Sequence, residues 1–128
     1  MARALHQLGL VHDSFEEALL AREAASPTAL PLPGRKLAVP HADPEHVRAP
    51  AIACATLSEP VKFREMGNPD QELAVEVVAL LALTDHDSAR RELVRFLQCS
   101  QDASFLDRLC ACHDAAALCA LLDKEVGG

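Results

Sequence analysis

The hydrophobic pattern begins as a helix near the start of the chain. Residues 13–25, DSFEEALLAREAA, repeat apolar positions at the spacing of an amphipathic α-helix. One face of this helix holds Phe15, Ala18, Leu19 and Arg22. Ser14, followed three residues later by Glu17, indicates a capping box at the helix start. Arg22 lies at the end of this apolar stripe. If it has no chemical role, its methylene groups pack against apolar neighbours and its guanidinium reaches water.

The middle of the chain has the short apolar runs that are typical of strands. Residues 37–39 form such a run, and Pro40 ends it. A proline-rich loop over 26–36 precedes the run, and a loop or single helical turn over 40–50 follows it. AIACATL, 51–57, predicts a buried strand. PVKF, from Pro60, predicts a short edge strand followed by a polar turn, REMGNPD. The longest apolar run, LAVEVVALLAL at 73–83, carries its β-branched residues in its first half and predicts a central strand.

After residues 84–87 the pattern becomes helical again. Successive apolar stripes hold Leu93, Phe96 and Leu97, and then Leu106, Leu109 and Cys110. Asp114 is placed to cap a last helix that carries Leu118, Leu121, Leu122 and Val126. The order of one helix, several strands and then helices predicts an α/β sheet covered by helices.

Composition narrows the class of protein. The 128 residues correspond to one domain, 1–128, and half of them are apolar. A net charge of −7 argues against nucleic-acid binding, which needs clustered lysine and arginine. The odd number of cysteines, five, and the absence of zinc-type spacing favour a reduced setting inside the cell. With no leader pattern and no run of 18 apolar residues, we expect a cytoplasmic chain without a membrane segment.

The candidate chemistry centres on KLAVPHADPEHV, residues 36–47. His41 follows a strand end, where open α/β sheets bind ligands, and it could act as base, metal ligand or nucleophile, or be an exposed loop residue. A metal hydrolase at His41, Asp43 and His46 is one alternative, although no signature fixes a further ligand. Cys54 lies in a predicted buried strand and is a poor nucleophile. No glycine-rich nucleotide-binding motif is present.

The string AREAASPTALPLPGRKLAVPHAD resembles the enzyme IIA domains of the bacterial phosphoenolpyruvate-dependent sugar phosphotransferase system. The similarity is to the fructose, mannitol and galactitol superfamily and is greatest to the galactitol type. It rests on Arg22-Glu23, Thr28 and residues 38–42, AVPHA, together with the downstream PVKFREMG, and it runs from about Leu10 to Leu122. The resemblance implies a mannitol/fructose-like fold, a single-domain mixed sheet with helices on both faces.

The resemblance also implies a phosphorelay. His41 would accept a phosphoryl group from the phosphocarrier protein HPr and pass it to a cysteine of an enzyme IIB partner, during sugar uptake through a membrane IIC component. Arg22 would steady the phosphate, because a guanidinium binds two phosphoryl oxygens at once. Thr28 would be a secondary site residue that donates a hydroxyl hydrogen bond. No cofactor or metal is implied.

One departure from the family pattern concerns a second histidine. Mannitol and fructose relatives carry one at the start of the helix after the long strand, and here that position falls at Ala89 or Arg90. We expect His86 or Arg90 to reach the site instead. A regulatory module, whose His41 phosphorylation state controls binding to a partner protein, is the alternative function. The sugar and the oligomeric state are not readable from the sequence.

Overall fold

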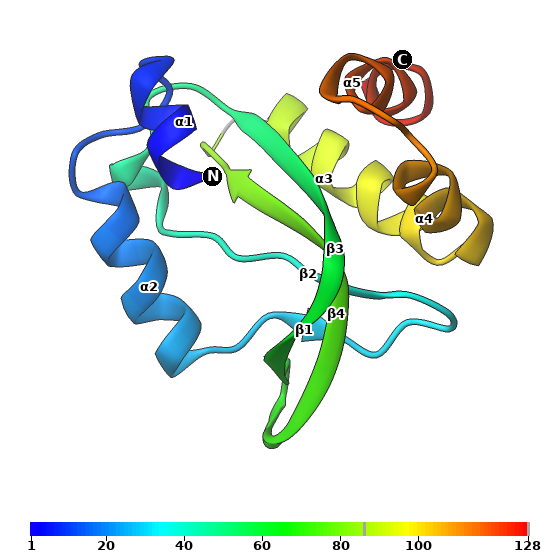
Figure 1. Cartoon of the computed structure of the whole chain (residues 1–128). Helices are drawn as coiled ribbons and strands as arrows, with labels where there is room; N and C mark the ends of the chain where they lie inside the picture. The colour runs from blue at the N-terminus through cyan, green and yellow to red at the C-terminus, as the bar shows by residue number, and fades with distance from the viewer. Residues whose placement is uncertain (86, 128) are drawn as a thin grey trace.

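Helices enclose a small sheet from two sides in the computed structural model, which describes residues 1–85 and 87–127 (Figure 1). Its elements, in chain order, are α1 (Ala2–Gln7), α2 (Phe15–Ala25), β1 (Ala29–Leu30), β2 (Lys36–Ala38), the 3-10 turn η1 (Pro44–His46), β3 (Ala51–Glu65), β4 (Asn68–Ala82), α3 (Asp87–Ser100), α4 (Ala103–Cys110), α5 (Ala115–Leu122) and the π-helical turn η2 (Asp123–Gly127). None of the described helices is long and apolar enough to cross a membrane.

The sheet is mixed, as the family resemblance implied. Its strand order is β1–β2–β4–β3, and it closes on itself because β1 also pairs with the end of β3, at Ala29 and Glu65. β3 and β4 form a long antiparallel hairpin, while β2 runs parallel to β4. β4 therefore lies between two partners, and the prediction of a central strand at 73–83 is confirmed.

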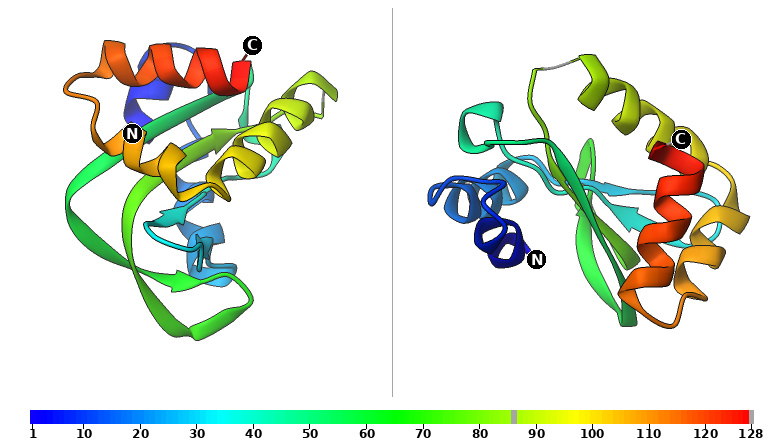
Figure 2. Two further views of the ribbon diagram at one scale, coloured as in Figure 1. Left: turned by 90° about the vertical axis from the view of Figure 1, so that its right-hand side faces the viewer. Right: turned by 90° about the horizontal axis from the view of Figure 1, so that it is seen from above.

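Residues of β4 point alternately to the two sides of the sheet, as a strand with helices on both faces requires. Val77, Ala79 and Leu81 join the core beneath α3, α4 and α5. Leu80 and Ala82 join a second core beneath α1 and α2. Figure 2 shows the two helical layers on opposite sides of the strands. The predicted α/β architecture is thus confirmed.

The β3–β4 hairpin differs from the prediction in its length. The two strands predicted at 51–57 and from Pro60 are one strand, β3, whose register shifts between Thr56 and Val61. Proline has no N–H for a ladder bond, so an irregularity is the place where a strand tolerates it. Residues 51–57 are half-buried rather than buried. The turn between the two strands is shorter than the predicted REMGNPD and consists of Met66 and Gly67. The φ of Gly67 is +78°, a conformation that suits glycine.

The ends of the helices confirm one predicted cap and contradict another. Asp114 caps α5 by accepting a hydrogen bond from the Ala117 N–H at 2.8 Å. Val126 lies beyond this helix, in η2. Ser14 stands at the N-cap of α2 but makes no side-chain cap, because its hydroxyl lies 2.7 Å from Nδ1 of His46. The predicted capping box is therefore wrong.

Two short elements were not predicted from the sequence. α1 has six residues and buries Leu5 against the second core. β1 has two residues within the segment predicted as a loop, and it exists through its pairing with β2 and β3. Both elements depend on contacts with distant parts of the chain, which a local pattern does not contain.

Candidate functional site

His41 lies at the carboxyl ends of the two parallel strands β2 and β4. β2 ends at Ala38, and the following segment continues beside β4: the Leu81 N–H donates to the Pro40 carbonyl at 2.9 Å, and His41 bridges to Leu81. Pro40 is buried, whereas His41 is half-buried. This is the edge of a sheet where α/β proteins bind their ligands, and the strand end predicted before His41 is confirmed.

The two nitrogens of the His41 ring have different environments. Nδ1 lies 2.9 Å from the carbonyl oxygen of Val39. Because a carbonyl only accepts hydrogen bonds, Nδ1 must carry the proton. In a neutral ring Nε2 then holds the lone pair, so it is the atom that can act as nucleophile, base or metal ligand.

Arg22 reaches the same segment from the last turn of α2. Its Nη1 donates to Oδ1 of Asp43, two residues after His41, at 2.7 Å. Its Nε is buried and has no hydrogen-bond partner among the described residues. A buried N–H without an acceptor is uncommon in proteins, and here it belongs to a guanidinium bonded to Asp43, two residues after the candidate nucleophile His41.

Thr28 lies behind the site rather than on its surface. Its side chain is 2 % exposed, and its hydroxyl donates to Oε1 of Glu23 at 2.7 Å. Its backbone N–H donates to the other carboxylate oxygen, at 3.1 Å. A threonine hydroxyl has a single proton, so the proton expected to serve a phosphate is donated to Glu23.

His46 and Asp43 are bonded to other side chains and are not arranged to share a metal ion. His46 uses Nδ1 on Ser14, and Asp43 is bound to Arg22. Within residues 1–85 and 87–127 no group of three histidine, cysteine or carboxylate side chains is arranged to hold a metal ion. The geometry therefore separates His41 from Asp43 and His46 as possible ligands of one metal ion.

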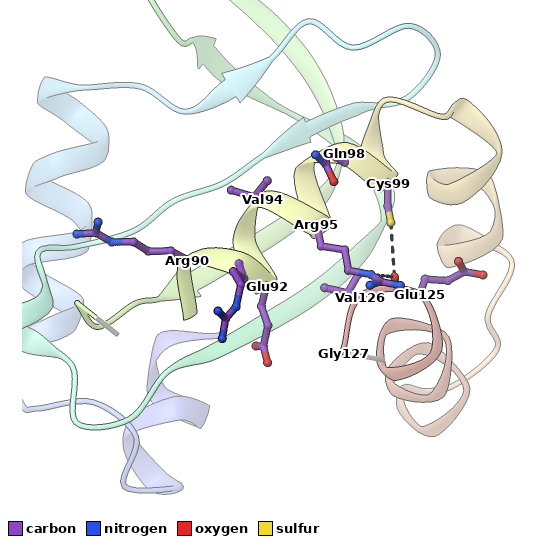
Figure 3. Close-up of a pocket in the computed structure, with 10 residues that line it drawn as sticks. Arg90, Glu92, Val94, Arg95, Gln98, Cys99, Glu125, Val126 and Gly127 are labelled. Carbon is purple, nitrogen blue, oxygen red and sulfur yellow. Dashed lines mark hydrogen bonds between the residues drawn. The ribbon is translucent and has the colours of Figure 1, made fainter. Parts of the chain in front are cut away.

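Arg90 and His86 were expected to substitute for a second histidine. Arg90 belongs to α3, which begins five residues after β4 ends; its side chain is 70 % exposed, with Nη2 4.0 Å from Oδ1 of Asp85. It lines the end of an open groove of about 770 Å³ between α3 and η2, and Figure 3 shows its side chain extended away from Arg95 and Glu125. His86 lies outside the described residues.

The cysteines lie away from this chemistry. Cys54 packs against the core beneath α3–α5, and burial raises the pKa of its thiol to about 12. Burial also raises the pKa of Cys110. Both thiols are protonated at neutral pH, which agrees with the interpretation of Cys54 as a poor nucleophile.

Sequence reasoning missed two parts of the site. Glu23 had been noted only as the neighbour of Arg22, and its bonds to Thr28 were not foreseen. The pairing of Arg22 with Asp43 was also missed. For Arg22 and Asp43 the only signal was their opposite charge, which does not by itself identify partners. Thr28 is uncharged, so its bonds to Glu23 had no such signal.

Comparison with curated proteins identifies relatives in sugar transport. The chain is 33% identical over 89 residues to the galactitol-specific EIIA component of the phosphotransferase system of Escherichia coli, covering 70% of this chain and 58% of that protein. It is 40% identical over 76 residues to the 2-O-alpha-mannosyl-D-glycerate-specific EIIABC component of the same species, covering 59% of this chain and 11% of that protein. The chain thus spans less than two thirds of the length of these curated relatives.

Solved structures show the same fold. IIA mannitol from Escherichia coli superposes with a TM-score of 0.65 at 22% identity, over 92% of this chain and 80% of that one. The complex of enzyme IIA and phosphorylated enzyme IIB for mannitol, from the same species, matches with a TM-score of 0.68 at 20% identity, over 94% of this chain and 80% of that one. These likenesses confirm the mannitol-like architecture.

The family model described as "phosphoenolpyruvate-dependent sugar phosphotransferase system, EIIA 2" matches residues 1–125, nearly the whole chain. The family expected from the sequence is therefore confirmed, with galactitol-specific components among the relatives. The chain belongs to the EIIA 2 family of the phosphoenolpyruvate-dependent sugar phosphotransferase system.

Proposed function

We propose that this chain is a cytoplasmic phosphoryl carrier that accepts a phosphoryl group from phosphorylated HPr on Nε2 of His41. The N–P bond of the donor breaks as the bond from phosphorus to Nε2 forms, and the donor imidazole recovers its electron pair. In the second step the N–P bond at His41 breaks and a cysteine sulfur of an enzyme IIB partner takes the phosphoryl group.

The observation that carries this proposal is the hydrogen bond from Nδ1 of His41 to the Val39 carbonyl. It leaves Nε2 as the lone-pair nitrogen, which is the nucleophilic atom of a neutral imidazole. The same bond favours the phosphorylated ring, because the Nδ1–H becomes a stronger donor when the imidazole gains positive charge. Membership of the EIIA 2 family supports phosphoryl transfer as the chemistry of this arrangement.

Arg22 supplies the charge that phosphoryl transfer requires. Such reactions depend on alignment and on stabilising charge at the transferring oxygens more than on covalent machinery. The guanidinium is held at the His41 segment by Asp43 and keeps a buried Nε–H without a partner among the described residues. We propose that this N–H and the outward part of the guanidinium donate to phosphoryl oxygens on Nε2. Arg90 is a secondary candidate for the same role from the start of α3.

The test is phosphorylation by the upstream components of the pathway. The chain is incubated with phosphoenolpyruvate, enzyme I and HPr, and intact mass is recorded. We expect a gain of one phosphoryl group that is labile in acid, and no gain for His41→Gln. His46→Gln is the matched control, because His46 is the next histidine along the chain and is directed to Ser14 instead; it should be phosphorylated normally.

The second step separates transport from regulation. Adding an enzyme IIB domain should remove the phosphoryl group from His41 and place it on the IIB cysteine. Acceptance without transfer to any IIB domain supplied would refute the relay to sugar and favour the regulatory alternative. Phosphorylation that persists in His41→Gln would refute the assignment of the acceptor.

A further inference from the structure

A continuous chain of hydrogen bonds joins Glu23, at the end of α2, to the His41 ring. The carboxylate of Glu23 accepts from both the N–H and the hydroxyl of Thr28, at 3.1 and 2.7 Å. The carbonyl of Thr28 accepts from the Val39 N–H at 3.3 Å. The carbonyl of the same Val39 accepts from Nδ1–H of His41 at 2.9 Å.

The middle of this chain is rigid and dry. Thr28 is 2 % exposed and Val39 4 % exposed. The two residues continue the pairing of β1 with β2, in which Ala29 lies opposite Ala38. Hydrogen bonds in such an environment are stronger than in water, and those to a carboxylate are stronger than those between neutral groups. Thr28 is therefore held at its N–H and hydroxyl by Glu23, and at its carbonyl by the Val39 N–H.

The carbonyl of Val39 belongs to the peptide between Val39 and Pro40, called here the Val39 peptide, and the position of this peptide decides which nitrogen of His41 is protonated. Its carbonyl oxygen accepts from Nδ1, so any rotation of this peptide removes the group that selects the Nδ1–H tautomer. A histidine side chain in water prefers the opposite tautomer, with the proton on Nε2, where it blocks the lone pair. The nitrogen of the Val39 peptide belongs to Pro40 and carries no N–H that could anchor it. Its orientation therefore follows the backbone of Val39, whose own N–H is bonded to Thr28.

We propose that Glu23 and Thr28 are positioning residues that set the tautomer of His41 through the Val39 peptide. Thr28 thus acts through two peptides and touches neither His41 nor a phosphoryl group. The proposal rests on the proposed function only in naming Nε2 as the reacting atom. The tautomer itself is a property of the resting protein and is measured without any phosphoryl transfer.

The direct test is ¹⁵N NMR of the histidine rings in the unphosphorylated protein, at about pH 8.5, above the ordinary titration range of histidine. In the wild type, Nδ1 of His41 should give a pyrrole-type signal and Nε2 a pyridine-type signal. Thr28→Val removes the hydroxyl at nearly constant shape, and Glu23→Ala removes the carboxylate. Both should move the two signals toward each other as the Nε2–H form becomes populated.

Two control variants separate positioning from stability. Thr28→Ser keeps the hydroxyl and should restore the wild-type signals. Leu118→Ala removes apolar contacts from the core in which Val39 also packs but leaves the four hydrogen bonds in place, so it should lower the melting temperature and leave the His41 signals unchanged. Glu23 is only half-buried, so Glu23→Ala keeps the test available if Thr28→Val does not fold.

The kinetic consequence should follow the tautomer. Loss of an orienting partner behind a reacting group typically costs about 10-fold to 100-fold in activity, and we expect acceptance from phosphorylated HPr to slow by about 10-fold in Thr28→Val and to recover in Thr28→Ser. Unchanged ¹⁵N signals in folded Thr28→Val and Glu23→Ala would overturn the proposal. If the signals move as expected but wild-type protein accepts no phosphoryl group, the proposed function fails and the positioning role stands.

Discussion

The two sides of the sheet differ in what they bury. Beneath α3–α5 the core is apolar apart from Ser100, whose hydroxyl donates to the Phe96 carbonyl of its own helix. The ring of Phe96 meets that of Phe105 edge to face, at 6.0 Å between ring centroids. On the α2 side, polar groups reach inward: Thr28 is buried on Glu23, and Nε of Arg22 is buried without a partner among the described residues. The first side mainly lowers the free energy of the fold. The second buries polar groups, and one of them, Nε of Arg22, costs stability because it has no hydrogen-bond partner among the described residues.

This division implies that stability and phosphoryl transfer can be changed separately. Substitutions beneath α3–α5 should mainly lower the free energy of unfolding, and substitution of Arg22 should mainly slow the reaction. The following variants test this separation, beginning with the one that should have the largest effect.

Phe105→Ala should have the largest effect on stability. The ring is 1 % exposed and packs against Phe96, so its loss leaves a cavity that should lower the free energy of unfolding by about 3–5 kcal/mol. Urea denaturation measures the change. The folded fraction should still accept a phosphoryl group at the wild-type rate; a slower reaction in fully folded protein would show that the two sides are coupled.

Arg22→Gln should slow the reaction strongly and change stability little, the opposite of Phe105→Ala. Removing a charged donor at the transferring group should slow acceptance from phosphorylated HPr by about 100-fold. Stability should change by no more than about 1 kcal/mol, because the ion pair with Asp43 is partly exposed. Stopped-flow or quench kinetics measures the rate. Arg3→Gln is the matched control, since Arg3 forms an exposed ion pair with Glu16 and should react normally.

The smallest effect should be a loss of stability in acid that arises from two carboxyls on the α3–α5 side. The Ser104 backbone N–H bonded to Asp102 lowers the pKa of that carboxyl, and the Arg108 hydrogen bond lowers the pKa of Glu125. A carboxyl with a lowered folded-state pKa stabilises the fold above its unfolded-state value, and this stabilisation is lost as pH falls through the folded-state value. In unfolded chains the carboxyls of aspartate and glutamate have pKa values of about 3.9 and 4.3.

Urea midpoints recorded between pH 6 and pH 3 should therefore decline below about pH 4.5 in the wild type. Asp102→Asn keeps an acceptor at the helix N-cap but removes the titrating group, so the decline should be shallower. Equal slopes for the two proteins would show that the Asp102 cap contributes nothing to acid sensitivity.

The parts of the fold that sequence reasoning predicted are those with local signals. Pro40 after an apolar run places His41 at a strand end, and Asp114 before an apolar stripe marks the start of α5. The central strand at 73–83 was recognisable because the second half of β4 is mostly buried and, apart from Glu76, apolar.

The parts that were not predicted depend on residues far apart in the chain. The Ser14 hydroxyl bonds to His46, 32 residues away, instead of capping its own helix. β1 exists only through its partners β2 and β3. In the site, the position of His41 was predicted, but the bonds from Glu23 through Thr28 and Val39 pass along peptide groups, whose contacts side-chain patterns do not reveal.

The most direct measurement is ¹⁵N–³¹P NMR of the phosphorylated protein labelled in its histidine rings. If the central claim is right, phosphorus couples to Nε2 of His41, and Nδ1 of the same ring keeps its proton on the Val39 carbonyl. Coupling to Nδ1 of His41, or to a nitrogen of any other histidine, would contradict it.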